Sequence, residues 1–346
     1  MPTSITTRLR LAARALLKDS TPAVRPPIPP ISAEEVEEAR LFFPMEKFFI
    51  FGHARSGTTL LARLVRVHPQ VHCNWQAHFF TRKPLLKALV ASPEVAAWLS
   101  HNSNRWNRGR DLSPVVLRAV SDYILERDAR RLGKNVVGDK SPSSINDGEA
   151  VRNLYQIYPD GRMVFIVRDG RDAAISHRIQ SFIDRMERIT DEDRKIYADF
   201  VKNPEAYLRG ERSLYTEQGI RNFAHGWVKN LVETEAEATK LFSGRFYHLR
   251  YEDLLADSWG EMCKLWSFLG VGGLDEVLHL ALDAEKASNP DADYQKGKNQ
   301  SLAQLTDKGK RGGWRNLFTA RDKQIFKEIA GQALVKWGYE QDLDWE

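Results

Sequence analysis

Four short, mainly apolar runs recur along this chain of 346 residues, and polar or glycine residues follow each of them. The runs lie within residues 48–51, 136–140, 163–167 and 246–249. Runs of this kind are typical of strands that are buried on both faces of a sheet. The first run is followed by apolar residues at helical spacing, Leu60, Leu61, Leu64 and Val65. Strands that alternate with helices predict an α/β fold with a mostly parallel central sheet.

Two longer regions contain no such run. Residues 81–135 have mostly helical patterns with polar breaks, and residues 178–222 are charged and interrupted. We expect the second region to form a helical insertion or lid, with the charged residues 184–195 facing solvent. Residues 101–110 form a basic loop that carries one tryptophan, Trp106.

Residues 1–45 differ in composition from the rest of the chain. Residues 1–18 are basic, and helical spacing places leucines and alanines on one face and cations on another. Such a segment predicts contact with a membrane surface or a partner protein, and a frayed terminal helix is the alternative. Five prolines make residues 20–31 an extended linker. Ser32 and Glu35 have the spacing of a capping box for a short acidic helix. We therefore expect a single α/β domain over residues 46–346.

The bulk composition narrows the class of protein. A net charge of +5 and a pI near 9.0 are consistent with anionic ligands. The only cysteines, Cys73 and Cys263, argue against a disulfide scaffold or a cysteine zinc site and favour a reducing cytoplasm. No apolar run is long enough to span a membrane, no nucleic-acid recognition motif is present, and no feature indicates an oligomeric state.

The strongest chemical signal is the loop between the first strand and its helix. Residues 52–59 read Gly-His-Ala-Arg-Ser-Gly-Thr-Thr, the spacing of a phosphate-binding P-loop. Backbone N–H groups at such a helix start have no intrahelical partner, and the helix dipole favours an anion. Thr58 replaces the lysine of nucleotide triphosphatases, and Arg55 lies inside the loop. These changes favour an anion other than ATP with magnesium.

Further polar residues follow the other predicted strands. Arg55, Lys140, Arg168 and Tyr251 all lie just beyond strand ends, where parallel sheets bind their ligands. Arg168 begins the sequence Arg-Asp-Gly-Arg, and Ser176 falls two turns into the next helix. An arginine fork together with a hydroxyl is suited to holding a second phosphate.

These motifs resemble those of the sulfotransferases that use PAPS (3′-phosphoadenosine 5′-phosphosulfate). Residues 55–59 are similar to the family's 5′-phosphosulfate loop, and Arg168 with Ser176 to its 3′-phosphate motif. Tyr251 matches a tyrosine that contacts adenine. Lys308 and Gly309 open a stretch similar to the C-terminal 3′-phosphate loop, although Asp307 replaces the arginine usual there. The resemblance covers about residues 47–319 and is greatest to carbohydrate and protein-tyrosine enzymes and their bacterial relatives.

The resemblance implies a P-loop-like sheet flanked by helices, with helical insertions that form the acceptor side. It implies sulfuryl transfer from PAPS as co-substrate, with no metal required, to an acceptor of unknown class. The 5′ group would be held by Arg55, Ser56, Gly57, Thr58 and Thr59, and the 3′-phosphate by Arg168, Ser176, Lys308 and Gly309. Lys140, in Gly-Asp-Lys-Ser-Pro, matches a family lysine near the sulfuryl group. A cytoplasmic bacterial member is expected.

Both positions at which relatives carry a general base are changed. Gln76 stands where many relatives have glutamate, and Pro142 where the cytosolic small-molecule enzymes have histidine. Because an amide takes no proton at pH 7, His78 becomes the candidate base and His53 a second one. Gln76 is open to three interpretations: an engineered Glu→Gln change, a residue that only positions an easily ionised acceptor, or a sign that the nucleotide is bound without turnover.

Two other functions remain open on the sequence. A P-loop kinase is disfavoured by the missing lysine, whereas a non-catalytic nucleotide-binding protein is favoured by Gln76.

Among the aromatic residues, Trp227 suits the core or stacking against adenine, and Trp75 and Trp106 suit either packing or the wall of an acceptor pocket.

Overall fold

The computed structural model describes residues 27–81, 85–101, 105–143, 147–184, 187, 189–288 and 311–345. Its centre is a five-stranded parallel sheet in the order β2-β3-β1-β4-β5. The strands are β1 (Glu46–Phe51), β2 (Val71–Trp75), β3 (Val136–Lys140), β4 (Arg162–Val167) and β5 (Phe246–Arg250). The predicted α/β class and four strands are confirmed. The sequence pattern missed β2.

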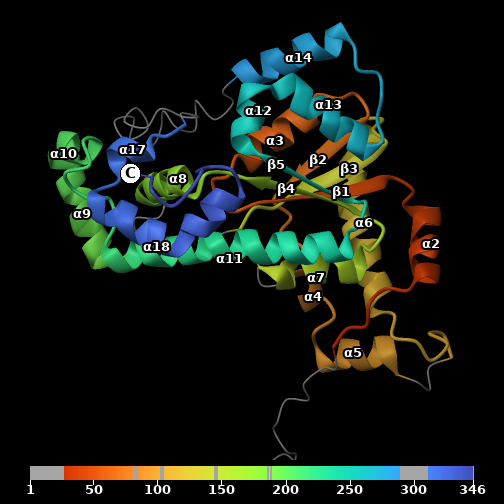
Figure 1. Cartoon of the computed structure of the whole chain (residues 1–346). Coiled ribbons are helices and arrows are strands. Elements are labelled where there is room, and N and C mark those ends of the chain that lie inside the picture. The colour runs from red at the N-terminus through yellow and green to blue at the C-terminus, as the bar shows by residue number, and fades with distance from the viewer. Residues whose placement is uncertain are drawn as a thin grey trace, which may run out of the picture.

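Helices cover both faces of the sheet, as Figure 1 shows. Side chains alternate along a strand, so Phe48 and Ile50 face one layer and Phe49 and Phe51 the other. The first layer is α3 (Thr58–Val65), α12 (Tyr251–Ala256), α13 (Ser258–Leu269) and α14 (Glu276–Ala287). The second contains α6 (Ser113–Arg131), α7 (Gly148–Ile157) and α11 (Glu217–Leu241). The core therefore lies in two apolar layers on either side of the sheet.

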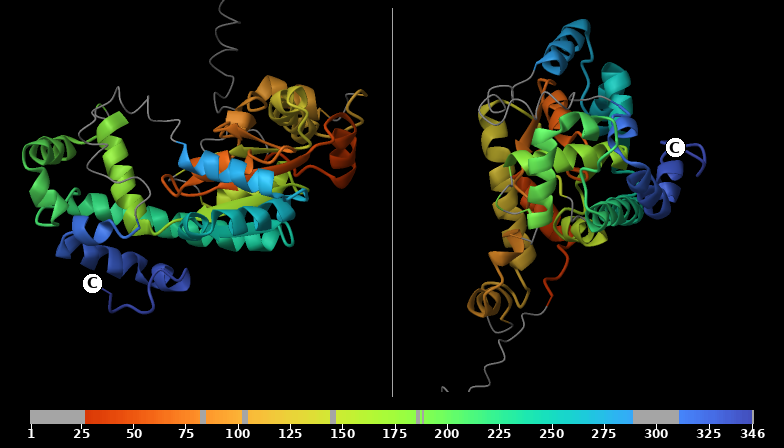
Figure 2. Two further views of the ribbon diagram at one scale, coloured as in Figure 1. Left: turned by 90° about the horizontal axis from the view of Figure 1, so that it is seen from above. Right: turned by 90° about the vertical axis from the view of Figure 1, so that its left-hand side faces the viewer.

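A helical lobe extends from one end of the sheet (Figures 1 and 2). It contains α8 (Gly170–Asp184), α9 (Asp191–Lys202), α10 (Pro204–Leu208), α17 (Trp314–Leu317) and α18 (Ala320–Lys336), and α11 runs from it beneath the sheet. The helical prediction for residues 178–222 is confirmed, but its ends belong to α8 and α11. The prediction that residues 184–195 face solvent is wrong for Asp193. Its carboxylate pairs with Arg178 at 2.9 Å, and these side chains are 14% and 7% exposed.

Helix α2 (Ala33–Phe42) begins as its capping box predicted. The Glu35 N–H donates to Ser32 Oγ at 3.2 Å, and the Ser32 N–H donates to Glu35 Oε2 at 2.9 Å. Residues 1–26, with the predicted amphipathic helix and most of the proline-rich linker, lie outside the described residues. The domain division at residue 46 stays a prediction. Two further helices, α4 (Leu85–Ala88) and α5 (Pro93–Ser100), lead into α6.

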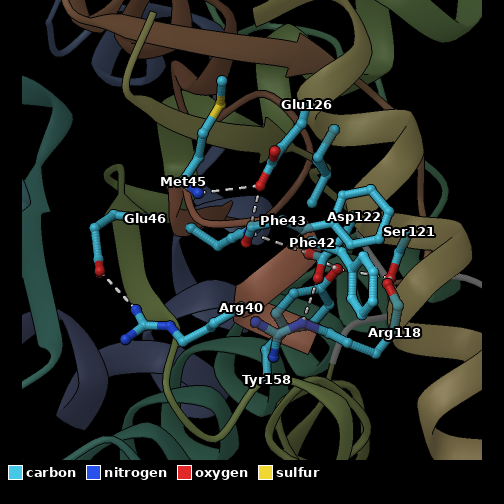
Figure 3. Close-up of polar contacts among 12 residues, drawn as sticks. Arg40, Phe42, Phe43, Met45, Glu46, Arg118, Ser121, Asp122, Glu126 and Tyr158 are labelled. Atoms are coloured by element: carbon cyan, nitrogen blue, oxygen red, sulfur yellow. Dashed lines mark hydrogen bonds and ion pairs between the residues drawn. The ribbon is translucent and has the colours of Figure 1, made fainter. Parts of the chain in front are cut away.

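A network of buried charges joins the start of β1 to α6 (Figure 3). Lys47 Nζ lies 2.7 Å from Glu126 and 3.6 Å from Asp122. The Arg118 guanidinium bonds Asp122 at 2.7 Å and Asp160 at 2.7 Å, and it lies over the Tyr158 ring. Burial nevertheless raises the pKa of Asp122. The network lies at the opposite end of β1 from residues 52–59, so its role is in folding.

Within the residues that the structure describes, no helix combines the length and the apolar character needed to cross a membrane.

Candidate functional site

Residues 52–57 form a tight loop at the point where the strand order changes direction. The chain places β2 and β3 on one side of β1 and β4 and β5 on the other, which opens a crevice at the carboxyl end of β1. Gly57, the N-cap of α3, has a φ of 87°. A Cβ there would lie 2.1 Å from Cδ2 of Tyr251. The loop therefore needs glycine both for its backbone conformation and for its close contact with Tyr251.

The loop and the first turn of α3 present groups that can bind an anion. Ser56 Oγ is buried and has no hydrogen-bond partner among the described residues. Thr58 and Thr59 open α3, whose N-cap residue makes no side-chain capping bond. Unpaired amides at a helix start, together with hydroxyls, match the needs of a phosphate or sulfate group.

Arg55 and the Arg168 motif meet in space although 113 residues separate them. Arg55 Nε donates to Ser176 Oγ at 3.0 Å, and Arg168 Nη1 donates to the Arg55 carbonyl oxygen at 3.1 Å. The Arg168 guanidinium lies 4.9 Å from the centre of the Tyr251 ring. Its Nε is buried without a hydrogen-bond partner in the described part of the chain. Arg55, Arg168 and Ser176, which were expected at the 5′ and 3′ phosphates, thus lie in contact with one another.

The start of α8 also holds the segment after residue 310. The Asp172 carboxylate accepts from the N–H groups of Gly312 at 2.8 Å and Trp314 at 3.1 Å. Arg171 is buried and lies 3.8 Å from the centre of the Trp314 ring. Asp172 was not among the site residues predicted from the sequence, where its position two residues after Gly170 of the Arg168 motif was the available signal. Lys308 and Gly309 lie outside the described residues.

A cleft of about 710 Å³ opens on the other side of the loop. Its lining includes Thr59, Arg66, Trp75, Gln76 and Lys140. Lys140 Nζ lies 3.4 Å from Thr59 Oγ1 and 4.7 Å from the centre of the Trp75 ring. Lys140 ends β3 as predicted, and β2 brings Trp75 and Gln76 beside it. The cleft therefore has a cation, a hydroxyl and an aromatic wall next to the loop.

Residues 76–78 form a strained turn, of which Gln76 lines this cleft. Gln76 and His78 both have left-handed backbone angles, φ 54° and 53°. Asp139 and Ser141 hold the turn: Asp139 Oδ1 accepts the Ala77 N–H at 3.0 Å, and Ser141 Oγ accepts the His78 N–H at 2.9 Å and donates to Asp139. Burial raises the pKa of Asp139 to about 6. Strained residues held by several bonds are characteristic of functional sites. This clamp was not predicted from the sequence.

The candidate bases His78 and His53 are both buried. His78 Nδ1 lies 2.9 Å from Thr81 Oγ1, and among the described residues His78 is absent from the cleft lining. His53 Nδ1 bonds the Ala54 carbonyl oxygen at 2.9 Å, and its ring packs edge-on against Phe223. Burial lowers the pKa of His53 from 6.5 to about 4, so this imidazole is neutral at pH 7.

The burial of His53 predicts a loss of stability in acid. Because its folded pKa is depressed, the stabilisation is complete above pH 6.5 and is lost as the pH falls towards 4. We expect wild type to lose about 3 kcal/mol more than His53→Asn between pH 7 and pH 4. Urea unfolding of both proteins at several pH values measures this difference. Asp139 has the opposite effect, because its raised pKa favours the folded state in acid. Both proteins contain Asp139, so its contribution cancels in the difference between them. Parallel pH profiles would contradict the assignment.

The tryptophans separate into different roles. Trp227 is a core residue: it is 1% exposed, and its Nε1 donates to the Arg168 carbonyl oxygen at 3.2 Å. Trp75 is 45% exposed and lines the cleft. Trp106 packs instead against Trp98, beyond α5, with ring centres 5.0 Å apart. It therefore does not form the wall of this cleft.

Known proteins of one family are similar in sequence to this chain. A family model described as "Sulfotransferase family" matches residues 47–276. Protein-tyrosine sulfotransferase 2 of Gallus gallus is 23% identical over 244 residues, which are 70% of this chain and 56% of that protein. The protein-tyrosine sulfotransferase of Drosophila melanogaster is 25% identical over 239 residues, 68% of this chain and 40% of that protein. The chain spans about half the length of the curated relatives it matches.

Two solved structures are similar at low identity. A mouse sulfotransferase complexed with PAP is 16% identical with a TM-score of 0.45, and the match covers 84% of each chain. The sulfotransferase domain of the Synechococcus PCC 7002 olefin synthase is 18% identical with a TM-score of 0.44, covering 82% of this chain and 94% of that one.

Proposed function

This chain belongs to the sulfotransferase family, and on that premise we propose that it transfers a sulfuryl group from PAPS to an acceptor hydroxyl or amine. The released product would be adenosine 3′,5′-bisphosphate. The observation that carries the proposal is the meeting of Arg55, Arg168 and Ser176 at one side of the loop, with Lys140 and the cleft at the other. This arrangement offers separate places for the two ends of the donor and for the acceptor.

In this proposal the loop amides, Ser56, Thr58 and Thr59 hold the phosphosulfate. Arg168 and Ser176 hold the 3′-phosphate, with Arg55 between the two groups because its side chain reaches Ser176. Tyr251, which packs against Gly57 and Arg168, contacts the adenine. Lys308 and Gly309 are assigned to the 3′-phosphate by resemblance alone.

Sulfuryl transfer breaks the bond between sulfur and the bridging phosphate oxygen and forms a bond from sulfur to the acceptor atom. The acceptor loses a proton, and the leaving phosphate gains negative charge. Lys140 lies beside Thr59 at the cleft, where a cation stabilises that charge during in-line displacement. We propose that the acceptor enters through the cleft.

Gln76 limits the acceptors that suit this site. Its side chain is an amide and takes no proton at pH 7, while His78 is turned into the protein towards Thr81. An acceptor that ionises easily, such as a phenol or an amine, needs least help from a base. We therefore propose that Gln76 positions an acceptor that ionises without help from a base in the cleft, and His78 stays the candidate base of the sequence analysis.

Ligand-induced stabilisation tests the donor site directly. Adenosine 3′,5′-bisphosphate at about a hundred times its dissociation constant should stabilise the fold by about 2.7 kcal/mol, which a thermal melt detects. ADP, which lacks the 3′-phosphate, should give a much smaller shift. A shift with ATP and magnesium but none with the bisphosphate would instead favour a kinase and overturn the proposal.

Removing the Arg168 guanidinium, which we assign to the 3′-phosphate, should weaken donor binding. We expect Arg168→Ala to cost about 1–3 kcal/mol of affinity for adenosine 3′,5′-bisphosphate, the scale of a charge-assisted hydrogen bond. The affinity for ADP should hardly change. Isothermal calorimetry of the variant measures both, with Arg209→Ala, an exposed arginine in the lobe, as control. Unchanged bisphosphate affinity would refute the role of Arg168.

Gln76 also supports a second function, binding of the nucleotide without turnover. Gln76→Glu separates the two functions because it restores a carboxylate at the cleft. If the chain is an enzyme, we expect the variant to raise turnover of aliphatic alcohols by about 100-fold, the lower end of the range for a general base, and that of ionised phenols much less. Product release from PAPS with each acceptor measures this. Donor binding without transfer by either protein, to any alcohol, phenol or amine tried, would favour the non-catalytic function.

A further inference from the structure

The basic loop beyond α5 presents an exposed surface that the proposed transfer reaction does not use. Trp98 and Trp106 pack against each other with tilted rings while remaining 60% and 51% exposed. Arg105, Arg108 and Arg110 lie close to Trp106 in the sequence and are also exposed. We call these five residues the Trp–Arg tip. Residues 105–110 contain three positive charges and no negative one.

The tip is held in one conformation by a buried side chain. Asn107 is fully buried, and its Nδ2 donates to the carbonyl oxygens of Leu99 at 3.2 Å and His101 at 3.3 Å. Its Oδ1 accepts the Gly109 N–H at 2.9 Å. Arg108 and Gly109 take the left-handed angles, φ 53° and 73°, that complete the turn. The buried Asn107 amide thus fixes the turn at residues 105–110, whose other residues are exposed.

The tip projects from the rest of the described fold. Figure 1 shows α5 at the lower edge of the described fold, away from the sheet and the lobe, and the right-hand view of Figure 2 shows the same projection. Leu89, between α4 and α5, adds another apolar side chain that is 53% exposed. A projecting edge of this kind can contact an extended flat surface while the rest of the protein stays clear of it.

We propose that the Trp–Arg tip binds the surface of an anionic phospholipid membrane. Indole rings prefer the interface between lipid chains and headgroups, because they combine a large apolar body with one N–H donor. Guanidinium groups pair with lipid phosphates, and each cation near an anionic membrane adds to binding. Residues of both kinds lie at one pre-organised edge, so little conformational entropy is lost on binding.

Co-sedimentation of the full chain with vesicles tests this proposal. We expect binding to vesicles of equal amounts of phosphatidylcholine and phosphatidylglycerol, much weaker binding to phosphatidylcholine alone, and loss of binding at high salt. Replacing Arg105, Arg108 and Arg110 by glutamine should lower the partition coefficient by about fivefold for each arginine and about 100-fold together. Trp98→Ser with Trp106→Ser should lower it by about tenfold.

The controls separate the tip from other features of the chain. Val277→Ser with Leu280→Ser removes two exposed apolar residues of α14 and should leave binding unchanged. Asn107→Ala keeps the tip's charges but frees the loop, so we expect a smaller loss than the arginine variant shows. Brominated lipids should quench wild-type tryptophan fluorescence more than that of the double tryptophan variant. Melting temperatures of all variants check that they fold.

Three results would overturn the proposal. The first is equal binding of wild type to neutral and anionic vesicles, or none to either. The second is wild-type binding by both tip variants, which would assign membrane contact to another segment such as residues 1–18. The third is binding of a single-stranded oligonucleotide, but not of vesicles, in a manner that the tip variants abolish.

Discussion

Replacing Lys140 by methionine should lower the turnover number by about 100- to 1000-fold, the cost of losing one positioned group that stabilises charge in a transition state. Lys140 is 1% exposed, and its Nζ lies 3.4 Å from Thr59 Oγ1 at the edge of the cleft. Methionine keeps most of the volume and the contact with Trp75 but removes the positive charge. The developing charge on the leaving phosphate would then face a buried apolar group.

The effect should appear in turnover more than in donor binding. Arg55, Arg168 and the loop amides still hold the nucleotide, so the affinity for adenosine 3′,5′-bisphosphate should change little. The measurement is release of the bisphosphate from PAPS in the presence of a phenol, beside calorimetry of product binding. Lys264→Met, at an exposed lysine on α13, is the matched control. Equal loss of affinity and turnover would make Lys140 a binding residue instead.

The buried charges around β1 should give the largest effect on stability. We expect Arg118→Met to destabilise the fold by about 3–5 kcal/mol, the usual cost of removing one partner from a buried ion pair. The Asp122 carboxylate, which Arg118 contacts at 2.7 Å, would be left with the Tyr158 hydroxyl at 2.9 Å and Lys47 at 3.6 Å. The Ile157 carbonyl oxygen would also lose its donor at 3.1 Å.

Helix α6 supplies its own control for this experiment. Arg131 lies on the same helix, with its side chain 75% exposed, and pairs with Asp128 at 3.7 Å. Arg131→Met should change stability by less than about 0.5 kcal/mol, because exposed ion pairs are screened by water and salt. Urea unfolding of the two variants beside wild type gives both values. Similar stability of all three proteins would mean that the network contributes little to folding.

The sequence by itself determined the parts of this protein that depend on neighbouring residues. The runs at 48–51 and 163–167 became β1 and β4, and the Ser32–Glu35 spacing became a capping box. The P-loop spacing at residues 52–59 became a tight loop followed at once by helix α3. These features are local, since a strand, a cap or a tight turn is set by the residues within a few positions of it.

Only the tertiary structure decided which distant side chains meet. Strand β2 carries His72 and Asn74 in a run too polar to stand out, and its register against β3 is what places Trp75 beside Lys140. The Asp139–Ser141 clamp on residues 76–78 and the contact between Arg55 and Ser176 join segments that are 62 or more residues apart. Such contacts follow from strand order, register and helix packing, and the short-range pattern of polar and apolar residues does not contain them.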